Sequence, residues 1–125
     1  MPTVRDVMSS ELVTVQASTM VIEAARTMFS GSAGSALVLD GGKLTGIFTE
    51  RDIMRALANE PDAGRSSRVA RWMTSDPVTI GPNATVGEAL DRMLAGHFRH
   101  LPVMEGEVVV GIVSMRDLAR NIAKK

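Results

Sequence analysis

The chain of 125 residues contains no cysteine and few aromatic residues: one Trp, three Phe and no Tyr. Without cysteine, the protein cannot form disulfides, thiolate metal sites, a cysteine nucleophile or a dithiol redox pair. With so few aromatic rings, it offers no extended platform on which nucleic-acid bases stack. A ligand that binds here would be held by aliphatic side chains, backbone groups and a few polar residues.

The chain also lacks net charge and any long apolar run. Fourteen basic residues balance fourteen acidic ones, so no overall positive field attracts a nucleic-acid backbone or an anionic membrane. No uninterrupted apolar run approaches the roughly 18 residues of a membrane span, and residues 1–10 do not lead into the apolar core of a signal peptide. We expect a folded protein with no nucleic-acid partner, no membrane partner and, by default, a cytoplasmic location.

What the sequence does contain is an internal repeat. A shift of 65 positions aligns residues 4–57 with residues 69–122 without a gap. Identical pairs occur along the whole alignment: Met8 with Met73, Val21 with Val86, Met28 with Met93, Val38 with Val103, Gly46 with Gly111, Asp52 with Asp117 and Arg55 with Arg120. Such self-similarity indicates a duplicated structural unit.

Residues 59–67 separate the two copies and are rich in turn-forming residues, as a surface linker is. The pattern predicts one repeat at 4–58, this linker, and a second repeat at 68–123. A unit of about 55 residues buries too little surface to be stable alone, so we expect the two repeats to pack as a pseudo-twofold pair. Clefts between similar units are common ligand sites.

Each repeat is predicted to run strand, helix, strand, strand, helix, which makes the fold class α+β. In the first repeat, Val13–Val15 predicts a strand, the apolar spacing from Val21 predicts a helix, and Asp40–Gly42 predicts the turn of a β-hairpin. A final helix is expected from Glu50, and from Met115 in the second repeat.

Hydroxyl residues precede the first long helix of each repeat. Thr19 or its neighbour Ser18 is expected to cap the helix of the first repeat. In the second repeat, the spacing of Thr85 and Glu88 is typical of a capping box.

The most informative motif joins the hairpin to the last helix of each repeat: Gly, apolar, any residue, Thr or Ser, two residues, Asp. It occupies Gly46–Asp52 and Gly111–Asp117. On one interpretation, Thr49 and Ser114 are helix N-caps and each Asp favourably faces the helix dipole. On the other, the hydroxyl contacts a phosphate or ribose while the carboxylate accepts hydrogen bonds from two vicinal hydroxyls. One residue is able to serve both roles.

Arg99 and His100 form a basic pair at the start of a predicted strand. They are either solvated surface residues or a phosphate-binding pair, since Arg offers a fixed fork of donors and His a pH-dependent one. The same register of the first repeat holds Gly34–Ser35, which carries no charge. His97 and His100 lack a third ligand, so we expect no metal site.

These ordered copies closely resemble the tandem cystathionine beta-synthase (CBS) domain pair, also called the Bateman module, over nearly the whole chain. The resemblance rests on short motifs in both repeats: Val7–Met8, Trp72–Met73, Asp76–Ile80, Arg99–Val103 and the two junctions. It implies two β-α-β-β-α repeats in a pseudo-twofold pair, commonly assembled as a homodimer. Members typically bind adenosine nucleotides or related adenosyl compounds between the repeats and regulate an attached or partner protein.

The resemblance also implies site residues. The nucleotide site would comprise Thr19, Leu37, Val38, Arg99, His100, Ile112, Ser114 and Asp117. A second site would comprise Ile47, Thr49, Asp52, Pro102 and Val103, with Ala84 beside them. Because Gly34–Ser35 replaces the basic pair and Ala84 replaces the hydroxyl of Thr19, we expect one ligand per chain.

The predicted function is that of a regulatory module that binds AMP, ADP or ATP, needs no cofactor and has no catalytic activity. It would act through the conformation of its homodimer or through an unidentified regulated protein. No nucleophile elbow, phosphate-binding loop, dinucleotide fingerprint or acid–base dyad supports an enzyme. The alternative is a structural or protein-interaction module that binds no nucleotide, or a module for another adenosyl ligand such as S-adenosylmethionine.

Overall fold

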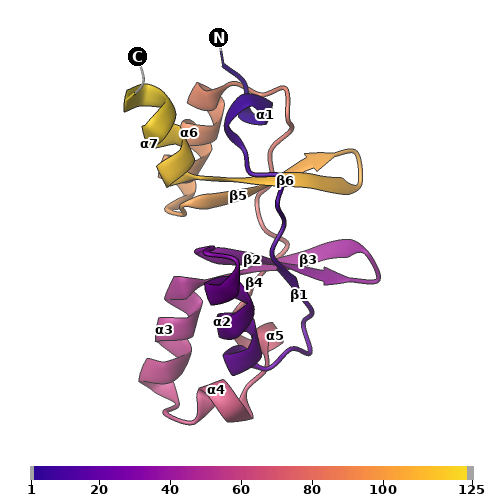
Figure 1. The fold of residues 1–125 in the computed structure, drawn as a ribbon, viewed down its shortest axis with the longest axis vertical. Helices are drawn as coiled ribbons and strands as arrows, with labels where there is room; N and C mark the ends of the chain where they lie inside the picture. The colour runs from indigo at the N-terminus through magenta and orange to yellow at the C-terminus, as the bar shows by residue number, and fades with distance from the viewer. Residues whose placement is uncertain (1, 124–125) are drawn as a thin grey trace. The chain divides into compact units, whose positions relative to one another are not determined.

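The computed structural model describes residues 2–123, and the side chains of all of these except Ala63 and Ala123. The chain forms two compact units. We call Val13–Pro77 the first unit, and residues 2–12 together with 78–123 the second unit. Each unit is a small sheet with helices packed on one face (Figure 1).

The first unit contains eight elements: β1 (Thr14–Val15), α2 (Val21–Ser30), β2 (Ser35–Asp40), β3 (Lys43–Thr49), α3 (Glu50–Asn59), α4 (Ala63–Ser66), α5 (Val69–Trp72) and β4 (Thr74–Ser75). Their sheet has the order β1-β2-β3-β4, with β1 parallel to β2 and the other neighbours antiparallel. Gly41 and Gly42 both adopt positive φ in the β2–β3 turn, as a two-residue hairpin requires. The predicted hairpin is confirmed.

Helical spacing explains the core of the first unit. Val21, Ala24 and Met28 share one face of α2 and are buried. They pack with Val38 and Phe48 of the sheet in one apolar cluster. The alternate residues of β2 point to the opposite face of the sheet, and Leu37, which is 1% exposed, is one of these.

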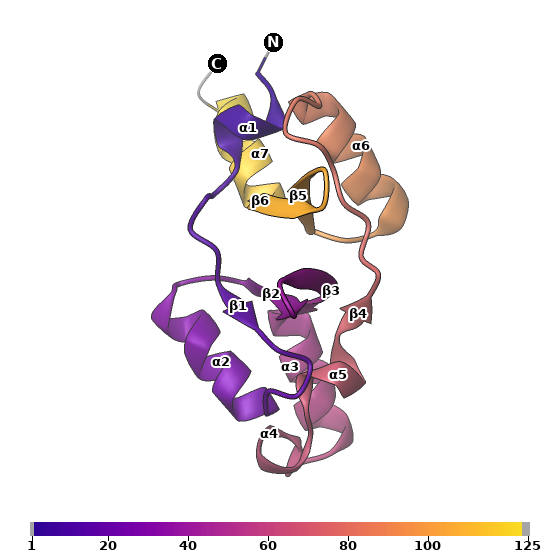
Figure 2. The ribbon, with the colours of Figure 1, turned by 90° about the vertical axis from the view of Figure 1, so that its right-hand side faces the viewer.

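The second unit contains α1 (Val4–Val7), α6 (Val86–Gly96), β5 (His100–Glu105), β6 (Val108–Ser114) and α7 (Met115–Ala123). Figure 2 shows α6 and α7 above the β5–β6 hairpin. Two isolated bridges extend this hairpin: Ile80 pairs in parallel with Val103, and Ser9 pairs antiparallel with Ile112. Both bridges have equivalents in the first unit. The Ile80–Val103 bridge corresponds to the parallel pairing of β1 with β2, and the Ser9–Ile112 bridge corresponds to the antiparallel pairing of β4 with β3.

The segment that precedes each repeat packs on the other repeat. A Cβ on Gly111 would lie 2.5 Å from Sδ of Met8 and 2.9 Å from the carbonyl oxygen of Ser9, so only glycine fits beside this segment. Gly46 stands in the same relation to Met73, at 2.7 Å. The compact units therefore differ from the sequence repeats at 4–58 and 68–123, because the two copies exchange their leading segments.

Among residues 2–123, no helix is long and apolar enough to cross a membrane.

Candidate functional site

The β6–α7 junction of the second unit is built around Ser114 and Asp117. Oδ2 of Asp117 accepts hydrogen bonds from the backbone N–H of Ser114 at 2.8 Å and from its hydroxyl at 3.0 Å. The N–H of Asp117 donates to Oγ of Ser114 at 3.1 Å. The N-cap interpretation is therefore confirmed here. Oδ1 of Asp117 has no partner among residues 2–123, so one carboxylate oxygen is left for a further donor.

The basic pair lies beside this junction. His100 is opposite Ser114 in the β5–β6 register, and the N–H of Met115 donates to the carbonyl oxygen of Arg99 at 2.8 Å. Arg99 is exposed and His100 is half-buried. The side chains of Arg99, His100, Ser114 and Asp117 thus belong to one end of the hairpin and the first turn of α7.

Ile112 is the fifth predicted residue that belongs to the second unit. Its backbone exchanges two hydrogen bonds with Ser9, of 2.8 and 2.9 Å. Its neighbour Val113 lies in the apolar core, so the half-buried Ile112 side chain faces the other side of the hairpin. The structure therefore brings together five of the eight predicted residues within one unit.

Thr19, Leu37 and Val38 belong to the first unit. Leu37 and Val38 are buried in β2, opposite Thr14 and Val15 of β1. Oγ1 of Thr19 accepts a hydrogen bond from the N–H of Gln16 at 3.0 Å. The role that the resemblance implies for these three residues stays a prediction.

The predicted cap of α2 is wrong. Met20 is the N-cap residue, and no side chain caps this helix. Thr19 lies one position too early, and its hydroxyl closes the preceding turn with Gln16 instead. Thr85, which aligns with Met20, accepts from the N–H of Glu88 at 3.1 Å, so the predicted Thr85 cap of α6 is present. The full capping box is not, because among the described residues the Glu88 side chain makes no return bond to the N–H of Thr85.

The β3–α3 junction of the first unit has the same cap but one more partner. Oδ2 of Asp52 accepts from the N–H and the hydroxyl of Thr49 at 2.9 and 3.1 Å. Oδ1 accepts from Nη1 of Arg55 at 2.9 Å. Asp52 is 5% exposed.

The remaining residues of the second predicted site are divided between the units. Ile47 is buried in β3 beside the Thr49 junction. Pro102 and Val103 are buried in β5, where the carbonyl oxygen of Pro102 accepts from the N–H of Ile80. A common site for these residues stays a prediction.

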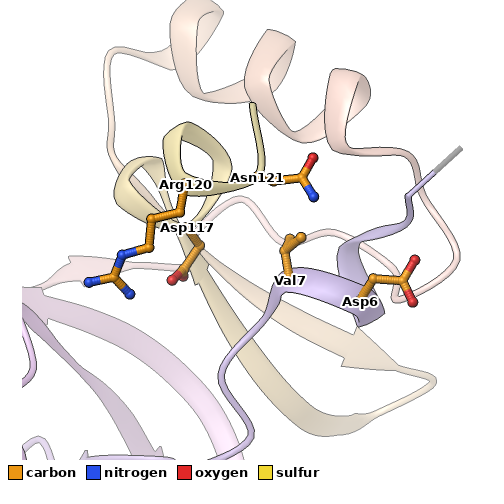
Figure 3. A pocket seen from close by; sticks show the side chains of 5 residues that line it. All are labelled: Asp6, Val7, Asp117, Arg120 and Asn121. Atoms are coloured by element: carbon orange, nitrogen blue, oxygen red, sulfur yellow. The ribbon is translucent and has the colours of Figure 1, made fainter. Parts of the chain in front are cut away.

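A pocket of about 240 Å³ opens between α1 and α7 of the second unit (Figure 3). It is lined by Asp6, Val7, Asp117, Arg120 and Asn121. The pKa of Asp6 is lowered, mainly because the backbone N–H of Thr3 donates to its carboxylate and also because the Thr3 hydroxyl does so. The predicted site residues do not include Arg120, although the repeat aligns it with an identical residue, Arg55.

Comparison with known proteins identifies both copies. The sequence model of the CBS domain matches residues 4–59 and 69–124. The CBS domain-containing protein YhcV of Bacillus subtilis is 33% identical over 122 residues, which cover 97% of this chain and 86% of that protein.

Solved structures agree with this assignment. The CBS-domain containing protein ATU1752 from Agrobacterium tumefaciens is 34% identical, with a TM-score of 0.88 over 94% of this chain and 91% of that one. The CBS domain pair of protein MJ0100 is 27% identical, with a TM-score of 0.89 over 100% of this chain and 99% of that one. That pair was crystallised in complex with 5′-methylthioadenosine and S-adenosyl-L-methionine. The predicted fold class is thereby confirmed.

Proposed function

Because the chain belongs to the CBS domain family, a pair of CBS repeats that is commonly a regulatory ligand-binding module, we propose that it binds an adenine nucleotide and acts without catalysis. The observation that carries this proposal is the Ser114–Asp117 junction. Its cap uses only Oδ2 of Asp117, and Oδ1 has no partner among residues 2–123. A ribose hydroxyl is a suitable donor for that oxygen.

Arg99 supports a ligand with a phosphate. It is exposed, and no ion pair with another residue of the range 2–123 occupies its guanidinium. Arg binds phosphate through two parallel charge-assisted hydrogen bonds, which are about twice as strong as neutral ones. We therefore rank AMP first, followed by ADP and ATP.

S-adenosylmethionine and 5′-methylthioadenosine are the competing ligands, because the related MJ0100 pair binds both. They share the adenosine with AMP but lack its phosphate. Calorimetric titration with AMP, adenosine and these two compounds separates the possibilities. We expect AMP to bind most tightly, at a micromolar Kd, which corresponds to about −8 kcal/mol.

A thermal-shift screen tests the function as a whole. A ligand that binds only the folded protein at a concentration of 100 times its Kd stabilises it by about 2.7 kcal/mol, which raises Tm by several degrees. No shift with millimolar AMP, ADP, ATP or S-adenosylmethionine would refute the proposal. It would favour the second candidate, a structural or protein-interaction module, in which Thr49–Asp52 and Ser114–Asp117 act only as the helix caps described above.

We further propose that the protein forms a homodimer through its long helices. Phe29 on α2 is 87% exposed and its repeat counterpart Leu94 on α6 is 59% exposed. Leu57 on α3 and its counterpart Ile122 on α7 are exposed by 48% and 56%. Exposed apolar side chains at equivalent positions of both units suit a twofold interface with a second copy.

Light scattering after size-exclusion chromatography tests the dimer. The double variant Phe29→Glu with Leu94→Glu should elute as a monomer, because it places charges in the proposed interface. Val108→Glu is the control, since Val108 is also exposed, at 64%, between the values of Phe29 and Leu94, but lies in the β5–β6 hairpin. A dimer that survives the double substitution would rule out this interface. Regulation would then act through a dimer with another interface or through a regulated partner protein.

A further inference from the structure

The two junctions have the same motif but differ in the state of the aspartate. In the first unit, both oxygens of Asp52 are used: Oδ2 by Thr49 and Oδ1 by Nη1 of Arg55 at 2.9 Å. The Asp52 side chain is only 8% exposed. Arg55 therefore competes with any ligand for Oδ1, the oxygen of Asp52 that the cap does not use.

Trp72 holds Arg55 in this position. Cζ of Arg55 lies 5.8 Å from the centre of the Trp72 ring, and its Nη1 lies 3.5 Å from the carbonyl oxygen of Trp72. Arg71 stacks on the same ring at 5.2 Å, but it pairs with Glu60 and does not contact Asp52. A guanidinium above an indole face is attracted by the ring quadrupole, so the ring favours the conformation in which Arg55 covers Asp52.

The second unit lacks this arrangement. The counterpart of Arg55 is Arg120, which forms no ion pair or ring contact with any residue from 2 to 123. The counterpart of Trp72 is Val7, which has no aromatic face. Val7, Arg120 and Asp117 instead line the open pocket of about 240 Å³, in which Arg120 and Asp117 extend side by side from α7 without pairing (Figure 3).

We propose that Arg55, positioned by Trp72, is an internal competitor that occupies the diol-binding oxygen of Asp52 and closes the first-unit junction to ligand. In the second unit, Val7 stands where the first unit has Trp72. No aromatic ring therefore holds Arg120 against Asp117, and the Asp117 junction stays open. This inference rests on the proposed function, in which the aspartates bind ribose hydroxyls. Competition by Arg55 is one reason to expect a single ligand per chain, and it acts on the ribose. The absence of a basic pair at Gly34–Ser35 is a separate reason, because such a pair would contact phosphate.

Adenosine is the probe that isolates this effect, since it has the diol but no phosphate. Calorimetry of wild type and Asp117→Ala first tests the proposed function: the substitution should weaken adenosine at the Asp117 junction about tenfold to a hundredfold. In the Asp117→Ala background, Arg55→Ala should then tighten adenosine binding at the first-unit junction by about tenfold, the value of one charge-assisted hydrogen bond reduced for the half-exposed Arg55.

Arg71→Ala in the same background is the matched control. It removes the other cation from Trp72 without freeing Asp52, so adenosine binding should not change. Arg55→Gln is a second variant that keeps the aliphatic stem over the ring, and thermal unfolding monitors the fold of each protein.

The outcomes separate the two ideas. If wild type binds no adenosine, or if Asp117→Ala does not weaken it, the proposed function of that junction fails. If Asp117→Ala weakens adenosine binding but neither Arg55 variant in that background binds adenosine more tightly, the competitor role of Arg55 is overturned and the proposed function stands. An equal gain with Arg71→Ala would also overturn it, because the effect would then come from loosening Trp72.

Discussion

Gly111→Ala tests the exchange of leading segments independently of any ligand. Gly111 lies in β6 next to Ile112, which exchanges two backbone hydrogen bonds with Ser9. A Cβ at this position would lie 2.5 Å from Sδ of Met8 and 2.9 Å from the carbonyl oxygen of Ser9. The Met8 side chain is flexible and is able to move, but the Ser9 carbonyl is part of the backbone ladder.

The size of the effect follows from these two contacts. Overpacking by one methyl group costs about 1–3 kcal/mol. Replacing glycine by alanine also lowers the conformational entropy of the unfolded chain. Where the native backbone tolerates alanine, this raises the free energy of unfolding by about 0.4–1 kcal/mol. Because the Ser9 carbonyl cannot retreat without weakening its hydrogen bond, we expect a net loss of about 2 kcal/mol, which lowers Tm by about 5–10 °C.

Thermal and urea unfolding measure this loss. The control is Gly81→Ala, because a Cβ on Gly81 meets nothing within 4 Å. Adding Met8→Ala to Gly111→Ala removes the sulfur contact but not the Ser9 contact, so it should restore only part of the stability. If Gly111→Ala is as stable as Gly81→Ala, the close packing of the first ten residues on the second repeat is incorrect.

Three further predictions concern single residues. Asp117→Ala should weaken AMP about tenfold to a hundredfold, because charged hydrogen bonds are worth about 1.5–3 kcal/mol; unchanged affinity in calorimetry would exclude this residue from the site. Arg99→Ala should weaken AMP much more than adenosine, and equal losses for both would remove Arg99 from the phosphate role. The pKa of Asp6 is lowered by Thr3, so its contribution to stability is present above its unfolded pKa and is lost as the pH falls through its lower folded pKa. Asp6→Asn should accordingly reduce the loss of Tm below about pH 4, and an unchanged acid limb of the Tm curve would contradict this.

Local chemistry made much of the fold predictable. The sequence predicts the hairpin turn at Asp40–Gly42 and the helix starts at Glu50 and Met115, and the structure contains all three. They depend on neighbours two to four residues away, which a sequence displays directly. The cap at Thr19 was wrong for the same local reason, since the turn with Gln16 competes for the hydroxyl.

The sequence by itself determined the family, the α+β class and the duplicated plan, because the repeat aligns most motifs with a copy. The resemblance to the CBS pair implied the five residues that the structure places at the Asp117 junction, and their role in binding stays a prediction. Only the tertiary structure decided which segment packs on which repeat. In the sequence, Met8 lies at the start of the first repeat. In the structure, it packs against Gly111 of the second repeat, about a hundred residues away.

The tertiary structure also decided how the two junctions differ. Arg55 and Arg120 are identical in the alignment, and so are Asp52 and Asp117. One arginine pairs with its aspartate and the other does not, because Trp72 lies beside the first and Val7 beside the second. Those two residues come from the exchanged segments, so the environment of each aspartate depends on contacts between distant parts of the chain.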